Sequence, residues 1–316
     1  MKLNFFKKFL AALCLIVPIA IMATGCTLVD TEARVSTVAE FKDAIANAKA
    51  GDKIILDADL VIDETIVIDK NITLDLNGKT ISNTQDLWSD VNWSLISITS
   101  GAEVTLDGDG KLIAKENDCY GIDVQDGSKL TVNSGYIKGN ISAIYAYEGT
   151  VTINGGKFEI QQLADGFKNP YSFVLNCYDS AFAEGKAKIT VYGGEFVKFN
   201  PANCMAEGAG TNSVAEGYVS TANEDGTLYT VSQQLDELEG TWTFGDWSLT
   251  FDGKGTLAAD NGATSANVAY TYNAEKKTLE FTFAGYDYSG KYDGTNLIIS
   301  DEYEEILINN KFVKAA

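Results

Sequence analysis

The feature that most constrains the fold is a strand–turn–strand unit that occurs five times between residues 71 and 199. The units are NITLDLNGKTI from Asn71, EVTLDGDGKLI from Glu103, KLTVNSGYIKG from Lys129, TVTINGGKFEI from Thr150 and KITVYGGEFVKF from Lys188. They share a threonine, found at Thr73, Thr105, Thr131, Thr152 and Thr190. The intervals between these threonines are 32, 26, 21 and 38 residues, which predicts repeats of about 21 to 26 residues with two insertions.

A second set of strands precedes the later units. It consists of SLISITSGA, GIDVQDGS, AIYAYEGT and, after an insertion, SFVLNCYDSAFAEGK. A turn glycine recurs before each threonine strand, at Gly101, Gly127, Gly149 and Gly185. Each repeat is then one rung of three strands and three turns, and because no rung can bury its own apolar side, the rungs must stack. Such stacking predicts that Ile98, Val124 and Ala146 point inward, one above the next.

These coils resemble the pectin-lyase-like right-handed parallel β-helix, and the resemblance covers residues 36–231. It implies an all-β column whose first rung is covered by an N-terminal capping helix. Thr37 and Glu40 have the spacing of a capping box, and four apolar residues follow on one helical face: Phe41, Ala44, Ile45 and Ala48. Without such a helix the first rung would expose apolar surface and an unpaired strand edge. Residues 215–231 resemble the closing coil at the other end.

A different pattern begins after Val231. Residues 232–239 are rich in Gln, Asp and Glu and are predicted to be a linker. Residues 240–316 contain eight short strands separated by glycine and asparagine turns, which is typical of a small antiparallel up-and-down β-barrel. The opening Gly240, Thr241 and Trp242 resemble the Gly-x-Trp start of lipocalin-like domains, in which the tryptophan packs across the barrel base.

The N-terminus has the pattern of an export signal. Lys2, Lys7 and Lys8 precede an apolar run at residues 9–22, which is too short to span a bilayer as a helix. Residues 23–26, Ala-Thr-Gly-Cys, resemble the bacterial lipobox, which implies a lipoprotein signal peptide over residues 1–25, lipidation of Cys26 and a tether over residues 26–35. The expected location is therefore the bacterial cell envelope, lipid-anchored at the cell surface or outer membrane. Ordinary signal cleavage, with Cys26 an incidental thiol, is the alternative.

The charge of the chain argues against one class of partner, and its cysteines limit the possible disulfides. Without the signal, Lys+Arg falls from 24 to 21 while Asp+Glu stays at 44, so the mature chain carries a formal charge of −23. Nucleic acid is not an expected partner at that charge. The remaining cysteines are Cys119, Cys177 and Cys204, which allow at most one internal disulfide. Neither a CxxC motif nor any histidine accompanies them, so buried free thiols are expected.

The sequence lacks the residues that enzymes of this superfold use. The resemblance implies that a lyase would need a basic residue on the rungs, yet the single arginine, Arg34, precedes the expected helix. Three lysines follow the turn after the threonine strand, Lys111, Lys138 and Lys157, and are interpreted as solvated turn residues. A hydrolase of this kind would pair carboxylates with a histidine, and the chain contains no histidine. No catalytic residue and no cofactor are therefore assigned.

Two sets of polar turn residues are interpreted as structural. Asp107 and Asp109 lie in the turn after a strand, where turn chemistry favours aspartate, and calcium binding is the weaker alternative. Asn77, Asn133 and Asn154 occupy the same turn of different units. Their amides are predicted to form a ladder between rungs.

The candidate binding residues lie in the two insertions. Residues 83–92 carry Trp88, with Trp93 just after them, and residues 162–171 carry Phe167 and Tyr171. Loops on a regular scaffold are where binding concentrates, and an aromatic ring can lie flat on the apolar face of a sugar. The alternative is that these rings fold back to cover the column.

Three functions follow from these observations. The favoured one is a non-catalytic surface protein, anchored in the membrane by lipid at Cys26, that presents a β-helix for adhesion or for contact with a glycan or a host or cell-surface protein. The alternatives are a carbohydrate-active enzyme, either polysaccharide lyase or hydrolase, and a carrier of a small apolar ligand through the C-terminal barrel.

Overall fold

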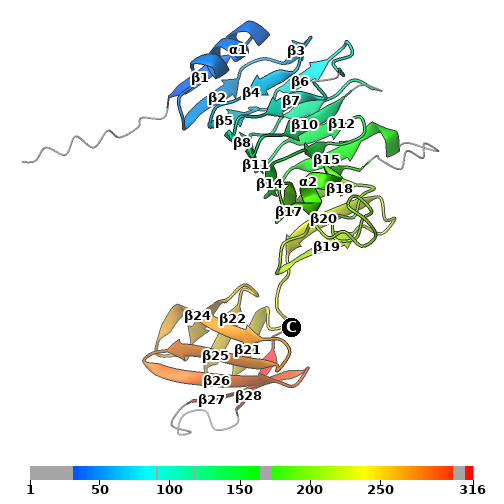
Figure 1. The fold of residues 1–316 in the computed structure, drawn as a ribbon. Coiled ribbons are helices and arrows are strands. Elements are labelled where there is room, and N and C mark those ends of the chain that lie inside the picture. The colour runs from blue at the N-terminus through cyan, green and yellow to red at the C-terminus, as the bar shows by residue number, and fades with distance from the viewer. Residues whose placement is uncertain (1–30, 90–91, 117–118, 164–172, 302–309, 316) are drawn as a thin grey trace, which may run out of the picture.

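The computed structural model describes residues 31–89, 92–116, 119–163, 173–301 and 310–315. Cys26, Phe167 and Tyr171 lie outside the described residues. Two separate hydrophobic cores are present, one built from residues 35–231 and one from residues 238–312. Figure 1 shows the corresponding two units, a stack of parallel strands and a barrel. No helix within the described ranges combines the length and the apolar character needed to cross a bilayer.

The N-terminal unit is a β-helix-like stack of three sheets, which the chain visits in rotation. The seven-stranded sheet contains β1 (Glu32–Val35), β2 (Asp52–Leu56), β5 (Ile72–Asp75), β8 (Glu103–Asp107), β11 (Lys129–Val132), β14 (Thr150–Ile153) and β17 (Lys188–Val191). The five-stranded sheet contains β4 (Ile66–Ile68), β7 (Ser94–Ile98), β10 (Tyr120–Val124), β13 (Ile144–Ala146) and β16 (Leu175–Cys177).

The third sheet has eight strands: β3 (Leu60–Ile62), β6 (Thr80–Asn83), β9 (Lys111–Ile113), β12 (Tyr136–Gly139), β15 (Lys157–Ile160), β18 (Gly194–Val197), β20 (Leu228–Gln233) and β19 (Tyr218–Ala222). Two short helical segments interrupt the later rungs, η1 (Gln161–Leu163) and α2 (Asp179–Ala183).

The strand register confirms the alignment of the repeats. Thr73 pairs with Thr105, Thr105 with Thr131, and so on in parallel register through Thr152 to Thr190. In the five-stranded sheet Ile98, Val124 and Ala146 pair in the same way and are buried. Each rung therefore places its apolar residues on those of the next, and the core runs through the stack.

Glycine allows the turns after the seven-stranded sheet to stack closely. A Cβ on Gly155 would lie 2.5 Å from the backbone oxygen of Asn133, and a Cβ on Gly193 would lie 2.2 Å from that of Asn154. Only a residue without a side chain fits these two positions. At Gly155 and Gly193, glycine is thus required by the distance between rungs.

The N-terminal end of the stack is covered by α1 (Val38–Asn47), as Figure 1 shows. The capping box forms: the Glu40 amide donates to Thr37 Oγ1 at 3.2 Å, and the Thr37 amide donates to Glu40 Oε2 at 3.1 Å. Phe41 and Ile45 are buried against the first strands. The helix predicted from the sequence is therefore present, with its apolar face on the core.

The C-terminal end of the stack is not closed by the coil that was expected from the sequence. Residues 215–231 do not form another parallel coil, because β20 pairs antiparallel with β18 and β19 pairs antiparallel with β20. The reversal lies between Ala222 and Leu228, where Asn223 Oδ1 accepts from the Thr227 amide at 2.9 Å. So short a connection can join only antiparallel neighbours. The last rung is therefore closed by a hairpin.

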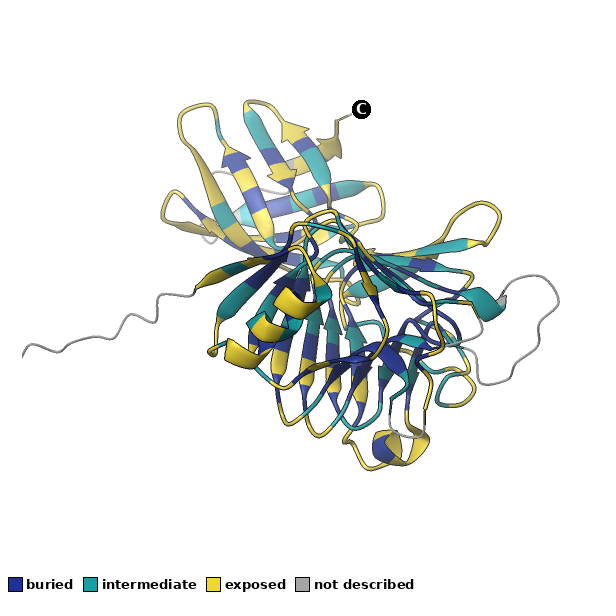
Figure 2. Ribbon diagram, turned by 90° about the horizontal axis from the view of Figure 1, so that it is seen from above, coloured by how far each residue is buried: buried dark blue, intermediate teal, exposed yellow. Residues whose placement is uncertain are grey.

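The C-terminal unit is a closed antiparallel barrel of eight strands, as the sequence predicts. The strands are β21 (Gly240–Phe244), β22 (Trp247–Phe251), β23 (Thr256–Asp260), β24 (Ser265–Asn273), β25 (Thr278–Phe283), β26 (Tyr286–Tyr292), β27 (Asn296–Asp301) and β28 (Asn310–Lys314). Closure comes from β28 pairing with β21. Buried and exposed residues alternate along its strands, which Figure 2 shows as alternating blue and yellow.

The predicted linker contributes to the barrel. Leu238 is buried in the barrel core, and its carbonyl accepts from Trp242 Nε1 at 2.7 Å. The Tyr272 hydroxyl donates to Glu237 Oε1 at 2.7 Å, and the Tyr270 hydroxyl donates to Asp236. Residues 236–238 thus lie against the strands at one end of the barrel.

Candidate functional site

Aromatic side chains gather along the five-stranded sheet. We call this set the aromatic row, and it comprises Trp88, Trp93, Tyr120, Tyr145, Tyr147 and Tyr178. Trp88 comes from the loop after β6, Trp93 directly precedes β7, and Tyr178 directly follows β16. In β13 the half-buried Tyr145 lies between buried Ile144 and Ala146, so its ring is on the outer side of the sheet.

The rings contact one another from rung to rung. Trp88 meets Tyr120 edge-on with centroids 5.1 Å apart, and Tyr120 lies 4.9 Å from Tyr145. Trp93 meets Tyr147 at 5.1 Å, and Tyr147 stacks on Tyr178 at 4.8 Å. The row crosses four neighbouring strands, β7, β10, β13 and β16. At about 4.8 Å between strands it extends over roughly 14 Å of the stack.

Solvent reaches the row along its length. Trp88 is 47% exposed and Tyr178 is 38% exposed, and the other four rings are half-buried. Rings packed by their neighbours on a rigid sheet lose little conformational freedom when a ligand covers them. The row is therefore an ordered surface that presents both apolar ring faces and phenol groups.

Two tyrosines of the row, Tyr120 and Tyr145, stay protonated at physiological pH. Burial raises the pKa of Tyr120 to about 12, and the negative charge of Asp123 adds to this effect. Burial also raises the pKa of Tyr145, with smaller contributions from neighbouring tyrosines and Asp179. Neutral phenols both donate and accept hydrogen bonds, so the row can bind hydroxyl groups of a ligand.

A fully buried carboxyl group lies within this sheet. Asp123 pairs with Ser97 on one side and with Tyr145 on the other, and none of its surface is exposed. Asp123 Oδ1 lies 2.5 Å from Ser94 Oγ, and Oδ2 accepts from Ser97 Oγ at 3.3 Å and from the Gln125 amide. Burial raises the pKa of Asp123, against the opposing effect of these hydrogen bonds.

The structure brings together two of the four candidate binding residues, Trp88 and Trp93. Phe167 and Tyr171 lie outside the described residues. The four tyrosines of the row were not predicted from the sequence. Their only signal was that tyrosine flanks or interrupts three successive apolar strands, in YGIDV, AIYAYEGT and NCYDS.

The asparagine residues fall into two positions. Asn133 and Asn154 lie in successive rungs, and Asn154 Nδ2 donates to Asn133 Oδ1 at 3.0 Å. Asn77 does not join them. Asn133 follows Val132, the strand partner of Leu106, so its counterpart in the preceding rung is Asp107. Asp107 in turn pairs with Asp75, not with Asn77. The Asn77 side chain instead donates to the Leu56 carbonyl at 2.9 Å. The predicted asparagine ladder is therefore wrong for Asn77, which is two residues out of register.

We expect Asn133→Ala to lower stability by about 1 kcal/mol, the net value of one hydrogen bond between side chains. That corresponds to a drop of about 2–4 °C in melting temperature. Asn267→Ala, at an exposed position on the barrel, is the matched control. Thermal unfolding followed by circular dichroism would test this, and an unchanged melting temperature for Asn133→Ala would contradict the interaction.

The acidic and basic turn residues have partners within the stack. Asp107 Oδ1 accepts from the Gly108 amide at 2.8 Å and from Ser134 Oγ at 3.1 Å. Lys138 pairs with Glu159 at 2.8 Å and Lys157 with Glu195 at 3.8 Å, whereas Lys111 is exposed. Two of the lysines interpreted as solvated are thus ion-paired between rungs. The described residues include no group of three or more acidic, cysteine or histidine side chains that could hold a metal.

Within the described ranges, Cys119, Cys177 and Cys204 form no disulfide bond. Cys119 and Cys177 are buried and Cys204 is half-buried. Burial raises the pKa of both the Cys177 and the Cys204 thiols, so they remain protonated.

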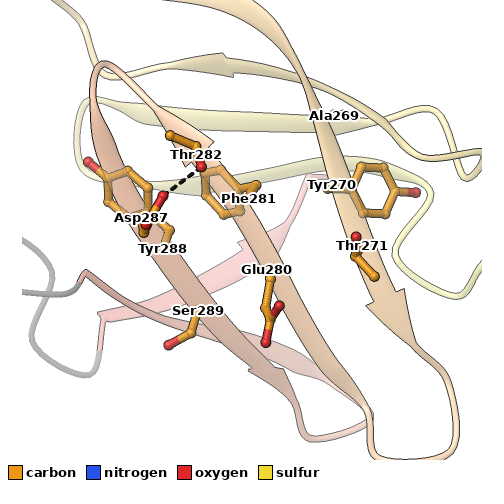
Figure 3. Close-up of a pocket in the computed structure, with 9 residues that line it drawn as sticks. All are labelled: Ala269, Tyr270, Thr271, Glu280, Phe281, Thr282, Asp287, Tyr288 and Ser289. Atoms are coloured by element: carbon orange, nitrogen blue, oxygen red, sulfur yellow. Dashed lines mark hydrogen bonds between the residues drawn. The ribbon is translucent and has the colours of Figure 1, made fainter.

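The barrel has a crevice of about 570 Å³ in its wall (Figure 3). It lies where β24 parts from β25, since β24 pairs with β25 only from Tyr270 onward. Phe281 and Tyr288 stack at 5.0 Å beneath it and are buried. Glu280 and Asp287 line it, and the Thr282 hydroxyl donates to Asp287 Oδ1 at 2.6 Å. The crevice is therefore a surface depression lined by two acidic side chains, and buried aromatic rings fill the barrel beneath it.

Comparison of the chain with models of protein families, with curated proteins and with solved structures found no significant match.

Proposed function

We propose that the mature chain is a non-catalytic, lipid-anchored surface protein whose aromatic row binds a neutral glycan. The observation that carries this proposal is the contact of six aromatic rings across four neighbouring strands. A run of rings on a regular sheet presents successive apolar faces in a line, which matches a ligand that itself repeats along a line. A sugar chain is such a ligand, because each unit offers an apolar face and a rim of hydroxyl groups.

The chemistry of the row suits hydroxyl groups. Tyr120 and Tyr145 keep their protons, so each phenol can donate a hydrogen bond to a sugar oxygen and accept one from a sugar hydroxyl. Their rings pack against the row and need no reordering when a ligand binds. The two groups supply the specific contacts, and the ring faces supply the contact area.

Charge favours a neutral glycan over an acidic one. The full chain has a formal charge of −20, and removal of the signal would make it more negative. Near the row, Asp179 directly follows Tyr178, and Lys115 in the adjacent loop is paired with Asp86 at 2.5 Å. A uronate or sulfated chain on this surface would meet like charge.

Burial argues against catalysis by the carboxyl group next to the row. In glycoside hydrolysis two carboxyl groups flank the bond that breaks and touch the substrate. Asp123 is fully buried and is held by Ser94, Ser97 and Gln125, so a glycan on the row does not touch it. We assign it to the support of the row.

The finer fold and the location belong to the same proposal. We propose that the stack is a right-handed, pectin-lyase-like β-helix and the barrel a lipocalin-like domain. The rotation of the chain through three sheets, whose rungs pair in parallel from β1 to β18, and the position of Trp242 at the barrel end support these assignments. Export and anchoring through lipid on Cys26 rest on the signal and lipobox patterns of residues 1–26.

A glycan array probed with the mature chain tests the function. We expect signal on neutral glycans, little signal on uronate polymers, and loss of signal in Trp93→Ala. Trp93 contacts both Tyr145 and Tyr147, so its removal disrupts the middle of the row. A flat array for the folded wild-type chain would overturn the proposal.

Three assays separate the alternatives. New absorbance from unsaturated products on uronate polymers would indicate a lyase, and release of reducing ends would indicate a hydrolase. Binding of a fluorescent fatty acid would favour a carrier, with the crevice between β24 and β25 as its first candidate site.

A further inference from the structure

Strand β24 has an open edge beside the crevice in the barrel wall. Among the described strands, Ser265–Ala269 pair with β23 only, and the pairing of β24 with β25 covers only residues 270–273. Strand β25 continues two residues beyond Phe281, the last partner of β24, and is paired there with β26. The ladder is therefore open over residues 265–269, and the crevice lies where it opens, lined by β24, β25 and β26 (Figure 3).

The backbone groups of this open edge point into the gap between β24 and β25. The Tyr270 amide donates at 2.9 Å to the carbonyl of Gly255, which directly precedes β23. Successive strand residues direct their backbone groups to opposite sides, so those of Asn267 and Ala269 point away from β23. Thr282 of β25 is the residue that would face Ala269 if the ladder continued. The open edge thus offers donors and acceptors to a further strand.

The inner side of the gap is apolar and incompletely covered. Val268 occupies an inward position of β24 and packs against the barrel core, yet it is only half-buried. Tyr270, the next inward residue, is buried, whereas Ala266, the inward residue before Val268, is exposed. Inward residues of a small closed barrel are normally covered by their neighbours. A strand added along the open edge would cover Val268 with an apolar side chain.

Charge is absent from the open edge and negative across the gap. Residues 265–269 read SANVA, without the charged residue or proline that commonly protects a free strand edge. The charged residues that line the crevice are Glu280 and Asp287. Both occupy exposed, outward positions of their strands. Outward-facing side chains of an added strand would therefore lie beside two carboxylates.

We propose that the gap between β24 and β25 binds an extended segment of a partner protein in which apolar and basic residues alternate. The segment pairs with the open edge at Asn267 and Ala269, and its apolar residues cover Val268. Its lysines or arginines face Glu280 and Asp287. Strand pairing supplies contacts that any sequence can make, and the two carboxylates select positive charge. This inference concerns the barrel and is independent of glycan binding by the aromatic row.

Charge also distinguishes this partner from a second copy of the chain. Two copies that paired their open edges about a two-fold axis would bring both pairs of carboxylates, Glu280 and Asp287, to the same interface. Each chain also carries a formal charge of −20. Like charges at an interface oppose association. The open edge therefore suits a basic segment better than it suits itself.

Fluorescence anisotropy of the mature chain with a labelled peptide, Lys-Val-Lys-Val-Lys-Val-Lys, tests the proposal. We expect this peptide to bind at least tenfold more tightly than Lys-Lys-Val-Val-Val-Lys-Lys, which has the same composition and charge without the alternation. Ala269→Pro should weaken binding at least tenfold, because proline removes an amide that faces the gap and leaves the bonds to β23 in place.

Two charge variants separate the site from the general attraction of a basic peptide to an acidic protein. Glu280→Lys should weaken binding at least tenfold. Glu275→Lys makes the same change in net charge at an exposed position in the turn between β24 and β25, at the other end of β24, and should weaken binding less than twofold. Circular dichroism would verify that each variant is folded.

Three results would overturn the proposal. The first is no binding of the alternating peptide. The second is equal binding of the two peptides, or equal losses in Glu280→Lys and Glu275→Lys, which would show that net charge alone attracts the peptide. The third is a dimer of the wild-type chain in analytical ultracentrifugation that is lost in Ala269→Pro, which would assign the open edge to a second copy.

Discussion

Replacing Tyr145 by alanine is expected to weaken binding of a neutral glycan about thirtyfold without unfolding the stack. Tyr145 lies at the centre of the row, with ring contacts to Tyr120, Trp93 and Tyr147. Central aromatic residues of a binding surface typically contribute about 2 kcal/mol when truncated, which corresponds to that factor. The core stays intact because the neighbours in β13, Ile144 and Ala146, are the residues that point inward.

Tyr192→Ala provides the matched control. Tyr192 is 39% exposed and meets Tyr218 edge-on at 5.2 Å, so its removal also breaks a tyrosine pair. It follows β17 in the seven-stranded sheet, away from the row. Isothermal titration calorimetry of both variants with the best neutral glycan from the array measures the difference. Equal losses in the two variants, or full affinity in Tyr145→Ala, would remove the row from the binding site.

The repeat made the stack predictable from the sequence. In strands whose residues alternate in burial, a slip of one residue would turn every apolar residue outward, and the shared threonine distinguishes the remaining registers. Thr105 and Thr131 illustrate this, since the sequence alignment and the strand pairing agree residue for residue. The capping helix was predictable for a similar reason, because Thr37 and Glu40 act locally.

The aromatic row was only partly predictable. Trp88 stood out because it interrupts the repeat, but Tyr120 and Tyr145 lie at different offsets in their strands. Tyr120 pairs with Ser94, whereas Tyr145 pairs with Asp123, so no alignment of repeats places the two tyrosines together. They meet because their rings lean across the strand boundary, at a centroid distance of 4.9 Å. Side-chain direction of this kind is not encoded in the period.

Two errors came from treating similar segments as equivalent. Asn77 was aligned with Asn133 because both follow the threonine strand, but Asp75 occupies the corresponding register. Residues 215–231 were expected to form a closing coil because they resemble that of a β-helix. The direction of the second strand depends on the length and polarity of the turn between them, and that turn reverses the chain.

Replacing Asp123 by asparagine is expected to leave the stack as stable as the wild type, or more stable, at neutral pH. The reason is the number of protons available for the hydrogen bonds between Asp123, Ser94 and the Ile96 carbonyl. Ser94 Oγ lies 2.8 Å from the Ile96 carbonyl oxygen and 2.5 Å from Asp123 Oδ1. A serine hydroxyl has one proton, and a carbonyl oxygen only accepts. Both contacts are satisfied when Asp123 Oδ1 carries a proton and donates it to Ser94.

The rest of the surroundings agree with a neutral acid. Oδ2 accepts from Ser97 and Gln125, so one oxygen acts as the acceptor and the other as the donor. The groups that face Asp123, including the protonated Tyr120, are uncharged, and an unpaired buried carboxylate is very costly. An asparagine amide offers the same acceptor and a donor in the same place. The substitution therefore imitates the protonated state.

The sign of the pH dependence follows from this. Burial raises the folded-state pKa of Asp123 above its unfolded value, so the folded state retains a proton that the unfolded state releases. The stability that this group contributes is complete below the unfolded pKa and is lost as pH rises toward the folded pKa, by about 1.4 kcal/mol per pH unit. The difference between Asp123→Asn and wild type should thus grow in favour of the variant as pH rises from about 4.

Urea unfolding of both proteins between pH 4 and pH 8 measures this difference, and the titration of the other carboxyl groups cancels in the comparison. Asp126→Asn is the control, since Asp126 lies in the next turn, is exposed, and accepts from the Thr99 hydroxyl. The comparison of the two variants shows whether the pH-dependent gain is specific to position 123. If Asp123→Asn is instead less stable than wild type by the same amount at every pH above 5, Asp123 is ionised in the folded protein and Ser94 donates its proton to it.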